Sequence, residues 1–119
     1  MGKRYTVAVD FDGVLHSYTT PWIAAETIPD PPVAGAIEWL NGIGDHFDVV
    51  IFTTRGKTAE GQRAVRHYLH EHGWRDAMNA TVTAEKPPAL VYIDDRAFRF
   101  EGAFPQAREI HALRPWNKP

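Results

Sequence analysis

Residues 5–14, YTVAVDFDGV, are the stretch of sequence that decides the fold. They open with β-branched and aromatic side chains, and Gly13 permits a turn shortly afterwards, so a buried strand is predicted over residues 5–10. Two carboxylates, Asp10 and Asp12, come at the end of this strand. The stretch therefore predicts a core strand that delivers acidic groups to one edge of a sheet.

The sequence that follows alternates between helical and strand patterns. Residues 33–44 and 58–72 carry apolar side chains at helical spacing, and each segment stops near a glycine, whereas residues 48–54 form a second apolar strand. Such alternation implies right-handed crossovers and a mainly parallel sheet. We therefore expect an α/β fold, a three-layer Rossmann-like domain with helices on the faces of its sheet.

Two further strands are predicted over residues 80–83 and 90–93. The segment between them is too short for the usual helical crossover between parallel strands. Either the former strand is a stub, or the chain returns through an extended segment with a tight turn at residues 86–88.

The rest of the chain is less regular. Residues 15–32 contain four prolines and predict an irregular loop with a short hairpin. A short strand at residues 98–100 and a short helix near residues 105–111 are expected after that, close to the end of the pattern. The loop is long enough to suggest a function of its own.

Composition limits the classes of function. The chain has 119 residues and is 44% hydrophobic, which is enough for one core, so we expect a single domain over residues 1–119. The formal net charge of −2 gives no support for a nucleic-acid partner, and the lack of cysteine rules out disulfides and thiolate zinc sites. Apolar stretches such as residues 49–52 are far too short to cross a bilayer. We expect a cytoplasmic protein without a membrane partner.

Polar side chains stand at the ends of three predicted strands. Because the carboxyl ends of parallel strands share the edge where ligands bind, these groups should converge on one crevice. They are Asp10, Asp12, Thr53, Thr54, Asp94 and Asp95. Clustered carboxylates repel one another and need a cation to stay ionised together. Oxygen ligands without His or Cys favour magnesium, and a hard cation beside hydroxyls and a lysine suits a phosphoryl group.

These residues resemble the four motifs of the haloacid dehalogenase superfamily, in the right order along the chain. Residues 10–14, DFDGV, resemble the first motif, Thr53 the second, Lys86 the third, and the pair Asp94 and Asp95 the fourth. The resemblance covers about residues 5–96. It implies a magnesium-dependent phosphatase that acts through an aspartyl-phosphate intermediate. No stretch has room for an inserted cap domain, so the fold should be capless and the site open.

The resemblance also implies a role for each residue of the first two motifs. Asp10 would be the nucleophile, and Asp12 would protonate the leaving oxygen and then activate water. The presence of Asp12 favours phosphate chemistry over dehalogenation. Thr53, helped by Thr54, would donate hydrogen bonds to the phosphoryl oxygens.

The later motifs would supply charge and metal ligands. Lys86 would neutralise the charge of the substrate phosphate. Asp94 would bind magnesium together with Asp10 and the backbone carbonyl of Asp12, and Asp95 would hold a metal-bound water or Lys86. The partner would be a phosphorylated small molecule or macromolecular end, and an oligomer could cover the open crevice.

The chain departs from the commonest family pattern in two places. Val14 stands where threonine is frequent in the first motif, and the interval from Lys86 to Asp94 is short. A calcium loop could also begin with Asp-x-Asp-Gly, but Val14 and Leu15 fill the next ligand positions and no glutamate follows where one is required. Both observations leave the phosphatase interpretation in place.

Several neighbours of the predicted site admit two interpretations. Arg55 and Lys57 follow the threonines and could meet an anionic substrate or simply be solvated. Trp22 and Tyr18, in the proline-rich loop, could stack on a base or sugar or merely pin the loop, and His16 is a comparable candidate.

Two other functions are open at this point. A phospho-accepting signalling module has a similar length, acidic cluster, threonine and lysine, although the order of the acidic motifs opposes it. A binding protein could retain the site without turnover. The presence of both Asp10 and Asp12 argues against a pure binder, which needs neither a nucleophile nor an acid.

Overall fold

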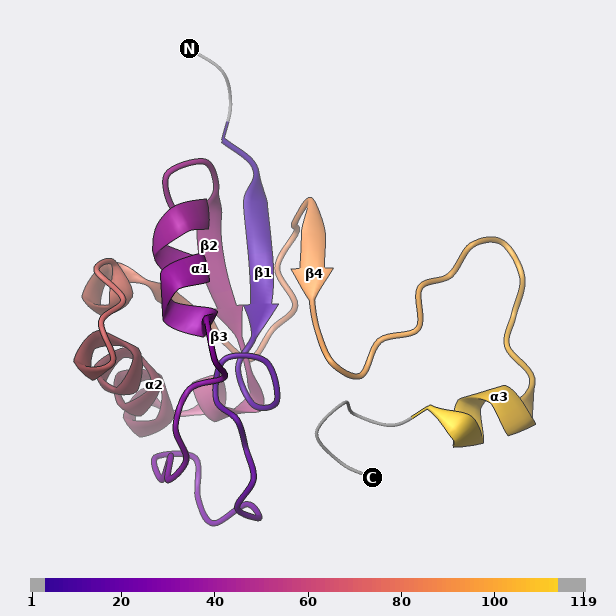
Figure 1. Cartoon of the computed structure of the whole chain (residues 1–119), viewed down its shortest axis with the longest axis horizontal. Helices are drawn as coiled ribbons and strands as arrows, with labels where there is room; N and C mark the ends of the chain where they lie inside the picture. The colour runs from indigo at the N-terminus through magenta and orange to yellow at the C-terminus, as the bar shows by residue number, and fades with distance from the viewer. Residues whose placement is uncertain (1–3, 114–119) are drawn as a thin grey trace.

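The computed structural model describes residues 4–113, which are organised around a four-stranded sheet (Figure 1). The strands are β1 (Thr6–Asp10), β2 (Asp48–Phe52), β3 (Thr81–Thr83) and β4 (Val91–Ile93). They lie in the order β3-β2-β1-β4, and each neighbouring pair is parallel. The expected α/β fold with a parallel sheet is therefore confirmed, and β1 is central, with β2 on one side and β4 on the other.

Two helices cover one face of this sheet. They are α1 (Ala36–Ile43) and α2 (Ala59–Glu71), within a few residues of the predicted ranges. The side-chain oxygen of Thr58 accepts a hydrogen bond from the backbone N–H of Gly61 (3.0 Å) and so caps the start of α2. Both helices bury their apolar residues in one core with alternate residues of the strands. The core includes Val7, Val9, Ile51, Leu40, Val65 and Leu69.

The opposite face of the sheet carries no helix in residues 4–113. After β3 the chain crosses to the far edge as an extended segment, residues 84–90, which Figure 1 shows in orange passing behind β1. The segment is tied down where Leu90 N–H donates to the carbonyl of Thr6 (2.8 Å) and the Tyr92 hydroxyl donates to the carbonyl of Pro87. The extended return is thus found, and the expected third layer is missing because this connection is too short to hold a helix.

The long loop between β1 and α1 folds back on itself near its two ends. Ser17 N–H donates to the carbonyl of Pro31 (3.0 Å), and Val33 N–H donates to the carbonyl of Leu15 (2.8 Å). This pairing confirms the short hairpin expected within the proline-rich segment. The loop therefore leaves the end of β1 and returns beside it, which keeps its middle part over the carboxyl edge of the sheet.

Residues 94–113 form an arm that extends away from the sheet (Figure 1). The arm ends in the short helix α3 (Ala107–Ala112), which buries none of its residues and matches the helix expected near residues 105–111. The strand expected at residues 98–100 is wrong, because that segment has no neighbouring strand to pair with. None of the helices within residues 4–113 is long and apolar enough to cross a membrane.

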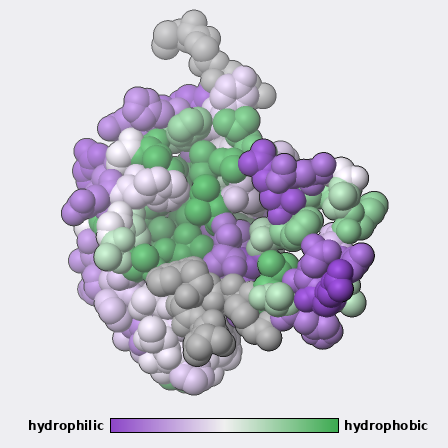
Figure 2. Space-filling model, turned by 45° about the vertical axis from the view of Figure 1, so that its right-hand side comes forward, coloured by the Kyte–Doolittle hydropathy of each residue, from purple (hydrophilic) through white to green (hydrophobic). Residues whose placement is uncertain are grey.

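Apolar side chains are gathered between the body of the molecule and this arm (Figure 2). A shallow hollow of about 210 Å³ lies there, lined by residues of α1, the loop before it and Ile93 of β4. Val91 of the same strand is 44% exposed. The surface is open because α1 and α2 cover the sheet as far as β1 but leave this face of β4 bare.

Candidate active site

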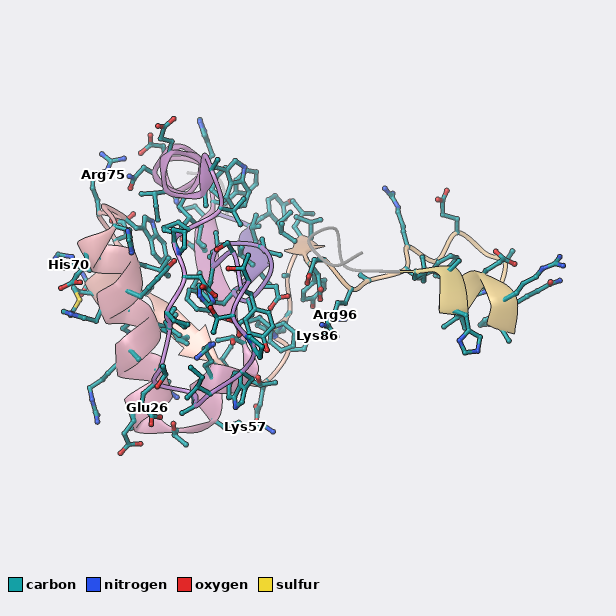
Figure 3. All side chains as sticks on the ribbon, turned by 60° about the horizontal axis from the view of Figure 1, so that its bottom comes forward. Glu26, Lys57, His70, Arg75, Lys86 and Arg96 are labelled. Atoms are coloured by element: carbon teal, nitrogen blue, oxygen red, sulfur yellow. The ribbon has the colours of Figure 1, made fainter. Side chains whose placement is uncertain are left out.

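The polar residues predicted at the strand ends meet around a cavity at the carboxyl edge of the sheet. The cavity has a volume of about 310 Å³ and is walled by the ends of β1, β2 and β4 and by the proline-rich loop. Its lining residues are Asp10, Asp12, Tyr18, Trp22, Phe52, Thr53, Thr54, Asp95 and Arg96. Figure 3 views this edge, with Arg96 near the base of the arm. The prediction that residues distant in sequence converge here is confirmed for both motif aspartates and both threonines.

Three carboxylates form a cluster in which a metal ion could be held. Asp10, Asp94 and Asp95 each offer an oxygen, and these oxygens all lie within 4.8 Å of one another. Asp10 comes from the end of β1, and the other two follow β4, the strand paired with it. The pairing of the first strand with the last therefore builds the cluster.

The state of these carboxylates fits a bound cation. Burial, and next the charge of Asp94, raise the pKa of Asp10 to about 8, so without a cation it holds a proton at neutral pH. Asp95 keeps one buried carboxylate oxygen, Oδ1, that has no hydrogen-bond partner among the described residues. A buried acceptor without a donor is costly unless a cation or water meets it. An all-oxygen set of this kind suits a hard cation.

Gly13 makes the close approach of Asp95 possible. Its φ is +87°, and a Cβ built there would lie 2.3 Å from Oδ2 of Asp95. A side chain at this position would therefore both strain the backbone and push the carboxylate out of the cluster. Gly13 thus permits the close packing of the two acidic strand ends.

The second aspartate of the motif is held by two buried side chains rather than by the acidic cluster. Nδ1 of His16 lies 2.8 Å from Oδ1 of Asp12, and Nε of Arg55 donates to both oxygens of Asp12 (3.1 and 2.9 Å). Burial alone would raise the pKa of Asp12, but the hydrogen bonds from His16 and Arg55 outweigh it and lower that pKa. The Asp12 carboxylate is therefore ionised at rest and fixed in direction.

His16 is itself oriented from its other ring nitrogen. The backbone N–H of Asp30 donates to Nε2 of His16 (3.1 Å), so Nε2 is the acceptor and Nδ1 carries the hydrogen that points at Asp12. The ring is fully buried and stacks on Phe11 with the centroids 5.5 Å apart. His16, considered from sequence as a substrate contact, instead positions Asp12.

Arg55 ties Asp12 to the proline-rich loop. Its Nη1 donates to three loop carbonyls, at 2.9 Å to Ala24, 2.8 Å to Ala25 and 3.0 Å to Thr27. The side chain is 1% exposed, and its guanidinium lies over the ring of Trp22 (4.5 Å to the centroid). Arg55 is therefore a buried side chain that holds Asp12 and the loop together. The sequence alone left open a solvated arginine or one that contacts an anionic substrate. Only the arginine's place straight after Thr53–Thr54 hinted at a role in the site.

The two threonines differ in accessibility. Thr53 is buried, and its Oγ1 accepts a hydrogen bond from the backbone N–H of Arg55 (3.2 Å), which caps the 3₁₀ turn η1 (Thr54–Lys57). Thr54 is exposed and lines the cavity. The hydroxyl of Thr54 is thus the more accessible to a ligand, and Thr53 also fixes the turn that places Arg55.

Lys86 lies apart from the cavity lining. Its Nζ is over the ring of Tyr92, 4.4 Å from the centroid, and its side chain is exposed on the extended segment between β3 and β4. In the view of Figure 3 the labels of Lys86 and Arg96 both fall close to the start of the arm. The cavity lining instead contains the cationic side chain of Arg96, for which no role was predicted.

A second hollow, of about 490 Å³, lies at the amino end of the strands. Arg4 crosses it, bonded through Nε to Asp48 (3.0 Å) and through Nη2 to two backbone carbonyls. The metal-type acidic cluster found in residues 4–113 is at the other end of the sheet. The carboxyl edge is therefore the candidate active site, as open parallel sheets generally favour.

Comparison of this chain with protein-family models, with curated proteins and with solved structures finds no match.

Proposed function

We propose that this protein is a magnesium-dependent phosphohydrolase that cleaves phosphate monoesters through an aspartyl-phosphate on Asp10. The observation that carries the proposal is the three-carboxylate cluster of Asp10, Asp94 and Asp95 beside a separately oriented Asp12. The resemblance of the motifs to the haloacid dehalogenase superfamily supports the same assignment. A nucleophile and an acid/base group two residues apart, with different surroundings, are what such a double displacement requires.

The first step forms a covalent intermediate. A carboxylate oxygen of Asp10 attacks phosphorus, the bond from phosphorus to the ester oxygen breaks, and Asp12 gives a proton to the departing oxygen. Bound at Asp10, Asp94 and Asp95, magnesium would keep Asp10 ionised and offset the charge of the phosphoryl group. The Thr54 hydroxyl and the cationic Arg96 would face the phosphoryl oxygens from the cavity wall.

The second step restores the enzyme. Asp12, again a carboxylate, takes a proton from water as the water oxygen attacks phosphorus, and the bond to Asp10 breaks to release inorganic phosphate. The lowered pKa of Asp12 keeps its carboxylate ionised, the form that can accept this proton. In the first step the proton has to arrive with the substrate, and a phosphate monoester with a second pKa of about 6 can bring it as the monoanion.

The test is phosphate release from aryl phosphate, sugar phosphates and nucleotides, with magnesium or with chelator. Asp10→Asn should lower turnover by about 10⁴-fold or more while the fold is retained, because the nucleophile is lost. Asp45→Asn is the matched control, since this exposed aspartate lies outside the cavity lining, and it should leave turnover unchanged.

Other outcomes would redirect the proposal. Turnover that does not change when chelator is added would contradict the proposed role of magnesium. Wild-type turnover in Asp10→Asn would show that Asp10 is not the nucleophile. A phosphate adduct on wild-type protein that persists without release, detected by intact mass, would favour the phospho-accepting module instead.

A further inference from the structure

We propose that the cavity binds a nucleobase attached to the phosphorylated sugar, stacked on Trp22, so that the substrates are nucleotides or nucleotide ends. This inference rests on the proposed phosphohydrolase function and names its substrate class. It is carried by the indole of Trp22, which lines the same cavity as Asp10.

Trp22 is a fixed aromatic platform. The Arg55 guanidinium lies over its ring at 4.5 Å from the centroid and so occupies one face of the indole. Arg55 is itself immobile, because Asp12 and the carbonyls of the loop hold it on several sides. The indole nevertheless remains 48% exposed. A ring that is held in place and still half-exposed beside a cavity is an arrangement on which a base can stack.

A second aromatic residue lines the cavity in a strained conformation. Tyr18 has a φ of 56° and is the one residue other than glycine with positive φ in the described part of the chain. Such a conformation costs free energy in a non-glycine residue and is concentrated at functional sites. The Tyr18 ring lies 5.9 Å from that of His16, the residue that orients Asp12. The strained backbone thus holds a second ring in the cavity wall.

The size and charge of the cavity agree with a nucleotide. Its volume of about 310 Å³ is at the lower end of the range for small-molecule sites, enough for one nucleotide rather than a larger molecule. Asp10 at one wall and Trp22 at another allow the phosphate and the base to be held in the same cavity. Arg96 adds a cation for the phosphate or sugar. The formal net charge of −2 provides no overall attraction for a long polynucleotide.

The experiment compares matched substrates that differ only in the base. The KM for adenosine 5′-monophosphate should be below that for ribose 5-phosphate, and Trp22→Ala should raise the KM for the nucleotide by roughly 5- to 100-fold, the range for one stacked base. The KM for ribose 5-phosphate should stay unchanged, and Trp22→Phe should restore most of the nucleotide affinity. If Trp22 only pins the loop, both substrates will weaken alike, and that result would overturn the base site.

Binding without turnover separates this inference from the proposed function. In Asp10→Asn protein, adenosine 5′-monophosphate should quench indole fluorescence more than ribose 5-phosphate does, and Trp22→Phe in that background should remove the difference. If wild-type protein binds adenosine 5′-monophosphate but does not hydrolyse it, the phosphohydrolase proposal is contradicted and the base site is still supported. Equal binding of the two ligands would sink the base site alone.

A third ligand distinguishes free nucleotides from the phosphorylated ends of nucleic acids as the substrate. A 5′-phosphorylated trinucleotide that loses the same factor on Trp22→Ala and is turned over better than the mononucleotide would assign the site to nucleic-acid ends. Preference for the mononucleotide would assign it to free nucleotides, and insensitivity of both to Trp22→Ala would contradict stacking altogether.

Discussion

The acidic groups that follow β1 are held from several sides, whereas those that follow β4 stand at the base of an exposed arm. Asp12 receives hydrogen bonds from two buried side chains. Asp94 is exposed, and its Oδ1 accepts a hydrogen bond from the backbone N–H of its near neighbour Arg96 (2.8 Å). We call these the β1–β2 half and the β4 half of the site. Packing and hydrogen bonds hold the β1–β2 half in place. The β4 half has fewer such contacts, and we expect a bound cation to order it.

This difference between the two halves indicates which carboxylates have to be positioned accurately. In the proposed reaction Asp12 transfers a proton and has to point in one direction, and the contacts from His16 and Arg55 hold it in one direction. A cation draws its own ligands together, so the exposed Asp94 needs only to be nearby. Substitutions in the β1–β2 half should therefore change stability and turnover, and those in the β4 half should change metal affinity.

The largest effect is expected from Arg55→Met, which tests the β1–β2 half. It leaves the Asp12 charge with His16 but without its cationic partner, and three loop carbonyls without their donor, a loss of about 3–5 kcal/mol in the free energy of unfolding. The melting temperature should fall by on the order of 10–20 °C. Thermal unfolding followed by circular dichroism measures it.

Arg63→Met is the control for that change. Arg63 and Glu60 are paired at 3.9 Å with side chains 68% and 65% exposed, so its loss should alter stability by less than about 0.5 kcal/mol. Equal melting temperatures for the two variants would show that the Arg55 contacts contribute nothing and would remove the contrast between the halves.

Asp94→Asn should produce the next largest effect, and in the β4 half. Removing one of three clustered carboxylates should weaken magnesium binding at least about tenfold, while the metal-free protein keeps its melting temperature, because Asp94 is exposed. Titration of activity with magnesium measures the affinity. A drop in metal-free stability comparable to that of Arg55→Met would contradict the division.

The pH dependence of metal binding should sharpen the comparison further. The pKa of Asp10 is raised to about 8 in the folded chain, so ionising it costs the metal-free protein stability as pH rises from about 4 through 8. Magnesium needs that ionised form, and its affinity should rise by up to tenfold per pH unit below 8. The gain in melting temperature on adding magnesium should thus be larger at pH 8 than at pH 6. An equal gain at both would rule out Asp10 as a ligand that loses a proton.

The smallest effect is expected for Lys86→Ala. The contact of Lys86 with Tyr92 is exposed, and cation–π contacts at such sites contribute about 0.5–1 kcal/mol. Stability should change by no more than this. If Lys86 also meets the substrate phosphate, as the family resemblance implies, the KM of every phosphorylated substrate should rise together. Unchanged KM values would leave Arg96 as the cation of the site.

The sequence was most informative where one residue's environment is set by its near neighbours. Apolar runs predicted β1 and β2, helical spacing predicted α1 and α2, and the rule for parallel sheets brought Asp10 and Asp95 to one edge. Each of these follows from local pattern plus topology.

The contacts that hold Asp12 could not be predicted in this way. Arg55 bonds to carbonyls of Ala24 and Thr27 in a loop without a repeating pattern, so nothing in the spacing signals the contact. The path of residues 84–90 across the bare face also depends on contacts between residues that are far apart in the sequence. This path places the Lys86 side chain over Tyr92, whereas the sequence alone predicted that Lys86 would contact a phosphate in the cavity.

The pairing of β4 with β1 has a consequence for the order in which the chain matures during synthesis. Strand β1 emerges first and pairs with β2 and, through it, with β3, so a nascent chain that ends before β4 already holds His16, Arg55 and the loop that clamp Asp12. Asp94 and Asp95 join the cluster only when β4 docks on the free edge of β1. A nascent chain that ends before β4 would therefore lack two of the three clustered carboxylates, and the proposed metal site would be completed last.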